Sequence, residues 1–290
     1  MPLFRKRTST QADELARLRR PSVGRKELDQ AVRSVVDEAG LPARRLKTAW
    51  MVEFDADVHI ALQPFHREGV VAGVMLVGET HGAEHMRELL TLNLEHRLSY
   101  FTGSTGPPEL DARIRIPVDP FDREGLLLGL QSLAELLDAL VDEDMGDLVA
   151  RITDVRRPPA TAPEPALRSA LEELGMPAAQ RADDVWRIDT TRGPLDVVLH
   201  PEGETWMLLQ PLDFPYERDD ERLLRWLLDA SGSRGARLGL DDAPDGLSVF
   251  TTTVLPAGGM NTSALAYGVE QVLRLNEGSA GALARYELAR

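Results

Sequence analysis

Apolar and polar residues along the chain follow two similar blocks, and each block opens with an amphipathic helix. Residues 33–42 align with residues 168–177 at a constant spacing of 135 positions. Each segment ends in a Gly followed two positions later by a Pro, the usual punctuation at the C-terminal end of a helix. Similarity at a fixed spacing predicts a duplicated structural unit.

The landmarks that follow keep the same order in both blocks. Strand-like runs begin at Trp50 and Trp186, and further short apolar strands are predicted at 58–62 and 70–77 in the first block and at 195–199 and 206–209 in the second. A leucine-rich helix comes next in each block, beginning near 87 and near 221. Alternating strands are then predicted around 114–118 and 247–253, followed by closing helices around 121–140 and 265–272.

Each block therefore reads helix, three strands, helix, two strands, helix. This order predicts an α+β fold of two tandem domains, each an antiparallel sheet flanked by helices. We expect the domains at 27–150 and 166–278, joined by a Pro-rich linker at 151–165. Residues 1–26 hold mostly basic charges and are expected to form a flexible tail, and 279–290 a C-terminal tail.

The first block carries the residues of a family resemblance. Its helix contains Asn93 within a run of leucines and leads into the aromatic pair Tyr100 and Phe101. This pattern resembles the YbjN family and the wider type III secretion chaperone-like fold. In the second block Leu227 replaces Asn93, so its resemblance rests on element order and spacing. The resemblance implies small binding modules that usually dimerise and hold a partner polypeptide, and it supplies no catalytic residues. Two such units in one chain imply a monomeric pseudodimer or a homodimer.

Charge and cysteine content narrow the function classes. The chain has 33 Lys and Arg against 47 Asp and Glu, a formal charge of −14, which disfavours binding to nucleic acid. It has no Cys, which excludes disulfides and thiolate chemistry and favours a reducing, cytoplasmic setting. No apolar stretch reaches the length of a membrane span.

One string resembles a metal site. His81, Glu84 and His85 match the His-x-x-Glu-His pattern of certain zinc peptidases, in which a helix presents two imidazoles and a carboxylate. Gly82 weakens that helix, and we favour a polar turn that enters the helix near Met86. A hydrolase using this cluster is the alternative function, and we expect no cofactor.

Two other polar features favour a structural interpretation. The loop 258–263 is predicted to cap the last helix through Asn261, Thr262 or Ser263. The adjacent carboxylates are interpreted as a solvated surface: Asp183 with Asp184, Asp219 with Asp220, and Asp241 with Asp242.

The partner contact is predicted on the helix of the second block. Trp226 lies beside Leu223 and Leu227, and the resulting apolar stripe is wider than one domain needs. We therefore expect a noncatalytic protein-binding module, chaperone-like or adaptor-like, with these three residues in contact with a domain or a protein partner. Trp50 and Trp186 occupy matching repeat positions and are expected in the core.

Overall fold

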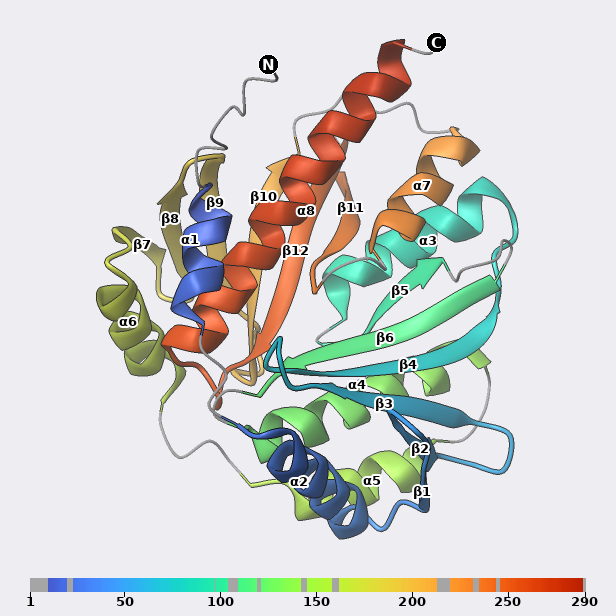
Figure 1. The fold of residues 1–290 in the computed structure, drawn as a ribbon. Helices are drawn as coiled ribbons and strands as arrows, with labels where there is room; N and C mark the ends of the chain where they lie inside the picture. The colour runs from blue at the N-terminus through green and yellow to red at the C-terminus, as the bar shows by residue number, and fades with distance from the viewer. Residues whose placement is uncertain are drawn as a thin grey trace, which may run out of the picture.

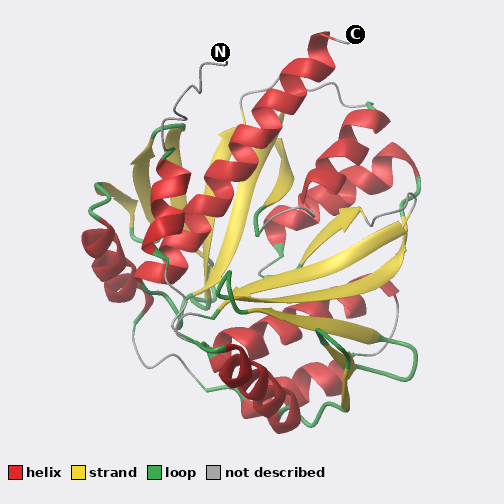
Figure 2. Cartoon of the chain, in the orientation of Figure 1, coloured by secondary structure: helices red, strands yellow, loops and turns green. Residues whose placement is uncertain are grey.

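The computed structural model describes residues 10–19, 23–96, 98–103, 109–118, 121–141, 145–157, 162–212, 220–231, 235–243 and 246–288. Across these residues the fold is α+β, with eight helices and two six-stranded antiparallel sheets (Figure 1). Helices and strands segregate into layers (Figure 2). The predicted fold class is confirmed, with two similar sheet-containing halves.

The first repeat forms the sheet with strand order β1-β2-β3-β4-β6-β5. Its elements are α2 (Arg25–Glu38), β1 (Ala43–Arg45), β2 (Trp50–Glu53), β3 (His59–Phe65), β4 (Val70–Glu79), α3 (Gly82–Glu95), β5 (Tyr100–Gly103), β6 (Glu109–Pro117) and α4 (Arg123–Val141).

The second repeat has the same topology, with strand order β7-β8-β9-β10-β12-β11. Its elements are α6 (Pro163–Leu174), β7 (Ala178–Ala182), β8 (Val185–Thr190), β9 (Gly193–Leu199), β10 (Thr205–Leu212), α7 (Glu221–Ser231), β11 (Arg237–Ala243), β12 (Gly246–Pro256) and α8 (Thr262–Leu288). Each repeat has one strand more than the sequence pattern predicts, β1 and β7. These strands are short, lie at the edge of a sheet and contain only Ala, Arg and Gln, so they carry no alternating apolar signal.

Strand register defines which residues of the repeats correspond. Leu62 lies opposite Trp50, and Val197 lies opposite Trp186. On the edge strands β1 and β7, Arg45 lies opposite Trp50 and Gln180 lies opposite Trp186. The two tryptophans are therefore equivalent, and Gln180 takes the place of Arg45 in the second repeat.

Helices cover one face of each sheet. In Figure 1, α2, α4 and α5 (Gly146–Val155) lie on one side of the first sheet. Close approach is possible because α4 and α8 present glycines to the strands. A Cβ at Gly129 would lie 3.0 Å from Ile116, and one at Gly268 would lie 2.8 Å from Leu255. A glycine therefore allows α4 to pack closely on the first sheet and α8 on the second.

The N-terminal segment is not a flexible tail in the part that the structure describes. Residues Gln11–Leu18 form helix α1, and Thr10 and Asp13 close its N-terminus with a capping box. Ala12 and Leu15 are buried, and α1 packs on α8 of the second repeat. The basic composition of this segment gave no sign that Ala12 and Leu15, about one helical turn apart, would be buried.

The predicted linker also needs correction. Helix α5 continues through Val155, and α6 begins at Pro163, so only residues 156–162 separate the two helices. Helix α5 packs on α4 of the first repeat. At the other end, α8 runs through Leu288, so the predicted C-terminal tail begins within a helix. Pro163 lies at the start of α6, a position that favours proline.

Helices α1 and α5 occupy equivalent places, and each crosses to the other repeat. The C-cap residue of α1, Arg19, pairs with Glu270 of α8 at 3.0 Å and donates to the carbonyl of Glu68 at 3.3 Å. The C-cap residue of α5, Arg156, donates to Gln131 of α4 and to Glu204, both at 2.5 Å. Each repeat therefore begins with a helix that covers the last helix of its neighbour.

Candidate functional site

Helix α7 carries the residues that the sequence indicated as partner contacts. It packs against β5 and α3 of the first repeat, and the Thr102 hydroxyl donates to the Leu228 carbonyl at 2.9 Å. Leu223 and Leu227 are 2% and 0% exposed, so neither is available to an external protein. Trp226 is half-buried against the core. The wide apolar stripe is therefore buried within the chain, on a helix that packs on the first repeat and on β11 of its own repeat.

The junction between the repeats is held by buried polar side chains. Asn93 Nδ2 donates to the carbonyls of Phe101 and Leu238, each at 3.1 Å, and its Oδ1 accepts from the Phe101 N–H at 2.7 Å. Arg237 donates to the carbonyls of Ser99 at 2.7 Å and His96 at 2.6 Å. Burial lowers the pKa of Arg237 to about 9, so it still carries its charge at neutral pH. The Asn93 contacts satisfy backbone groups of the edge strands β5 and β11, and the Arg237 contacts satisfy two carbonyls between α3 and β5.

Two buried tyrosines lie close to this junction. Burial raises the pKa of Tyr267 to about 12 and also raises the pKa of Tyr100. Arg19 stacks over the Tyr267 ring at 4.8 Å, and Arg237 over the Tyr100 ring at 5.7 Å. Phenols with raised pKa values remain neutral at physiological pH, so they act here as packing and stacking groups.

The His81–Glu84–His85 string lies at the start of α3. His81 is the N-cap residue, and its N–H donates to Nδ1 of His85 at 3.1 Å. The two rings stack with centroids 5.8 Å apart. One imidazole nitrogen of His85 is thus occupied by the helix terminus. Among the described residues, no group of three or more His, Asp or Glu is arranged to hold a metal ion.

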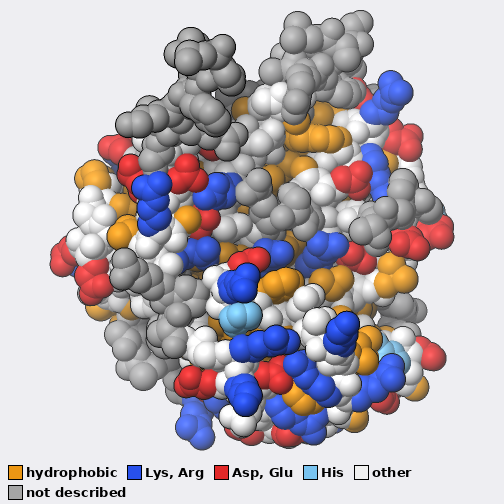
Figure 3. All heavy atoms as spheres, viewed as in Figure 1, with side chains coloured by type: hydrophobic (Ala, Val, Ile, Leu, Met, Phe, Trp, Pro, Cys, Tyr) orange, Lys and Arg blue, Asp and Glu red, His pale blue; other side chains and the backbone are white. Residues whose placement is uncertain are grey.

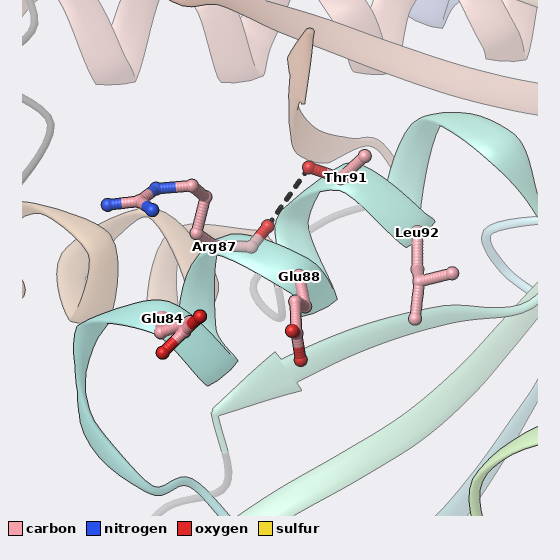
Figure 4. A pocket seen from close by; sticks show the side chains of 5 residues that line it. All are labelled: Glu84, Arg87, Glu88, Thr91 and Leu92. Carbon is pink, nitrogen blue, oxygen red and sulfur yellow. Dashed lines mark hydrogen bonds between the residues drawn. The ribbon is translucent and has the colours of Figure 1, made fainter. Parts of the chain in front are cut away.

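A shallow pocket of about 480 Å³ lies along the same helix (Figure 4). The described residues that line it all belong to α3: Glu84, Arg87, Glu88, Thr91 and Leu92. The Thr91 hydroxyl donates to the Arg87 carbonyl at 3.1 Å, a local helix contact. Figure 4 shows the side chains spreading in several directions from the helix, so they form a surface groove without convergent polar groups.

The predicted helix cap and the pairs of adjacent aspartates have structural roles or lie on the surface, as far as the structure describes them. Asn261 Oδ1 accepts from the Ala264 N–H at 3.0 Å and caps α8, as expected. Asp220 Oδ1 accepts from the Leu223 N–H at 3.1 Å and caps α7 in the same way. Asp183 and Asp184 are exposed in the turn before β8. Asp219 lies outside the described residues, as does the side chain of Asp242.

The face of the first sheet that points away from its helices is the strongest candidate for a binding surface. Met51, Ala61 and Val74 lie opposite one another on β2, β3 and β4 and are half-buried. Leu76 continues this face and is 62% exposed. The opposite face carries Ile114, which packs toward α4. We call Met51, Ala61, Val74 and Leu76 the open face of the first sheet.

The sequence pattern did not single out the open face. Strand β4 reads as a continuous apolar run, so its two faces cannot be told apart by alternation. The corresponding face of the second sheet includes Val198, Met207 and Leu209, all half-buried. It lacks an exposed leucine like Leu76 among the residues that the structure describes.

Comparisons with known proteins give little further guidance. No protein-family profile matches the chain. A tRNA dimethylallyltransferase of Synechococcus sp. (strain WH7803) is 34% identical over 127 residues. This match covers 37% of the chain and 41% of the length of that enzyme, so it does not define a family.

Proposed function

We propose that the chain is a noncatalytic protein-binding module, chaperone-like or adaptor-like, built as a pseudodimer of two diverged repeats. One observation carries the proposal: among the described residues, the open face of the first sheet presents three half-buried apolar side chains beside Leu76, which is 62% exposed. Neighbouring apolar residues left together on a surface mark interaction sites more often than chance exposure does.

The proposed occupant is an apolar segment of another polypeptide. A second copy of the chain is disfavoured because a net charge of −14 opposes self-association. The order of elements in each repeat, four strands, a helix, two strands and a helix after an opening helix, supports a YbjN-like or secretion-chaperone-like unit. We place this module in the cytoplasm, in keeping with a chain that has no Cys. No helix in the described part of the chain has the length and apolarity needed to cross a membrane.

Two exposed leucines provide a matched test. Leu76 lies on the open face at 62% exposure, and Leu18 lies on α1 at 60% exposure. Tagged full-length protein, Leu76→Glu and Leu18→Glu would be used for affinity capture from native cells with quantitative mass spectrometry. Each captured protein would then be purified and its Kd for the three forms measured by calorimetry.

We expect Leu76→Glu to weaken binding by on the order of tenfold or more, because a charge would be buried in the contact. Leu18→Glu should bind like the wild type. Equal affinities for all three forms would show that the open face is not the binding surface.

The hydrolase alternative gives a different outcome. It requires metal in the purified protein and a hydrolytic activity that His85→Ala abolishes. The position of His85 Nδ1, which accepts the His81 N–H, does not favour it. Metal-dependent hydrolysis lost in His85→Ala would replace the proposed function.

A further inference from the structure

A pocket of about 210 Å³ lies in the first repeat, apart from the open face. It is formed where three elements distant in sequence meet: the start of α2, strand β1 and the end of β3. The lining residues are Arg25, Asp29, Arg45, Thr48, Gln63, Pro64 and His66. Three of them are basic side chains from three separate elements. In Figure 3 the Lys and Arg side chains gather over the lower part of the view, where Figure 1 places α2, β1 and β2.

One arginine of the pocket is held in place before any ligand arrives. The guanidinium of Arg45 stacks on the Trp50 ring at 5.0 Å, and Arg33 lies over the same ring at 5.2 Å. Arg45 also pairs with Asp29 at 2.9 Å. A guanidinium fixed by stacking and by one carboxylate keeps further N–H donors in a rigid fork.

The remaining lining groups favour an anion. Within the described parts of the chain, the side chains of Arg25 and His66 make no hydrogen bond or ion pair. Thr48 and Gln63 add a hydroxyl and an amide. The one carboxylate in the lining, Asp29, is already shared with Arg45. The pocket therefore holds more donors and positive charge than its own acceptors use.

The second repeat shows that the fold itself does not need these cations. By strand register, Gln180 replaces Arg45 and Val198 replaces Gln63. Continuing three residues past Val198, Pro201 replaces His66. The tryptophan and the arginine stacked on it are kept, since Arg168 lies over Trp186 at 5.0 Å. Among the described residues, the first repeat combines that scaffold with basic side chains in a pocket, and the second repeat has neutral residues at the positions of Arg45 and His66.

We propose that this pocket binds a phosphate group. Pockets for drug-sized ligands measure about 300–1,000 Å³, so a volume of about 210 Å³ suits a single phosphate rather than a whole nucleotide. A tetrahedral dianion accepts hydrogen bonds from several directions, which matches donors arriving from α2, β1 and the β3–β4 turn. The phosphate belongs to a phosphorylated polypeptide or to a small phosphate ester. This site is independent of the open face and of the proposed function.

The test is calorimetric titration of the full-length chain with inorganic phosphate at constant ionic strength. Arg25→Gln and Arg45→Gln should each weaken binding by on the order of tenfold, because each removes a charge-assisted donor. Asp29→Asn should tighten binding, because it removes the carboxylate that competes for Arg45. Misfolding would weaken phosphate binding, so tighter binding by Asp29→Asn cannot come from misfolding. This variant therefore still tests the proposal if Arg45→Gln is too unstable to measure.

Arg168→Gln is the matched control, because it makes the same charge change at a stacked arginine of the second repeat. It should bind phosphate like the wild type. Titrations with a phosphoserine peptide and with glycerol phosphate distinguish the two sources, since the true source should bind more tightly than inorganic phosphate. Absence of phosphate binding by the wild type, or equal weakening in Arg168→Gln and Arg25→Gln, would overturn the proposal.

Discussion

Single buried polar residues set the geometry of the repeat junction. Asn93 is fully buried and satisfies three backbone groups, two on β5 and one on β11. Its equivalent in the second repeat is a leucine, Leu227, which is fully buried on α7. The junction is therefore approximately symmetric in shape and asymmetric in chemistry. A buried amide in one half fixes the relative position of two edge strands that apolar contacts alone would leave free to slide.

We expect Asn93→Ala to lower the free energy of unfolding by about 3 kcal/mol or more, because it leaves buried N–H and C=O groups without partners. Urea denaturation of the full-length protein measures this change. The control is Thr91→Ala on the same helix, which loses one half-buried local hydrogen bond and should cost under about 1 kcal/mol. Similar losses in the two variants would contradict this role for Asn93.

The raised pKa of Asp122 predicts that the stability of the protein depends on pH. It precedes α4, and desolvation raises its pKa despite hydrogen bonds from the Gly125 and Glu124 N–H groups. A raised carboxyl pKa means that the folded state binds the proton more tightly than the unfolded state. The ordinary pKa of an Asp carboxyl is 3.8, and the pKa of Asp122 in the folded state is higher. Its contribution to stability is therefore present below pH 3.8 and is lost as the pH rises through the folded-state pKa.

Asp122→Asn should consequently be at least as stable as the wild type at neutral pH. The second repeat already has an amide at the matching cap, Asn261. The melting temperatures of the two proteins should approach each other as the pH falls below the ordinary pKa of Asp. Thermal unfolding over a series of pH values measures this, and a variant clearly less stable than the wild type at neutral pH would be inconsistent with it.

At the scale of elements, the exchange of α1 and α5 between the repeats determines the interface. Each helix is short, and isolated helices of this length are marginal in water. Each is stabilised by packing on the long closing helix of the other repeat and by an arginine at its C-cap. Arg274 of α8 adds a contact to Asp13 of α1 at 3.0 Å.

Substitution of Leu15 should release α1. Leu15 is 5% exposed, and Leu15→Glu places a charge in the contact with α8, which we expect to cost about 3 kcal/mol. Trypsin should then cut after Arg17 and Arg19 much faster than in the wild type, as followed by mass spectrometry. Leu18→Glu on the same helix, where the leucine is 60% exposed, should leave the wild-type rate unchanged. Rapid cutting of the wild-type protein at Arg17 would mean that α1 is not docked.

At the scale of the whole molecule, the two repeats contact each other through equivalent elements, as the proposed pseudodimer requires. Helix α3 packs on β11 of the other repeat, α7 packs on β5, and the opening helices cross in both directions. A contact in which equivalent elements exchange places is the hallmark of a two-fold interface. In the proposed pseudodimer, the connection between α4 and α5 joins the two units.

A protease site inserted between α4 and α5 tests this organisation. After cleavage, the two halves should remain together as a 1:1 complex in native size-exclusion chromatography, because the exchanged helices and the buried junction hold them. They should separate only in denaturant. The uncut protein is the control, and separation of the cut halves at micromolar concentration in native buffer would argue against a dimer-like interface.

The sequence by itself determined the duplication, the fold class and the position of most helices and strands. Periodicity of 3.6 or 2 residues is a local property, so α3, α4 and β6 could be located from it. The two edge strands β1 and β7 were not predicted, because strands of three and five residues without large apolar side chains carry no periodic signal. Helix α1 was not predicted, because its segment has only two buried apolar residues and a mostly basic composition.

Only the tertiary structure decided which partner each apolar surface meets. The stripe around Leu223 and Leu227 signalled a contact, but a stripe does not say whether the contact lies inside the chain or beyond it. The open face and the cationic pocket depend on strand register, which brings Arg25, Arg45 and His66 together from separate elements. Such convergence is non-local, because it arises from the packing of distant segments rather than from the order of residues within any one of them.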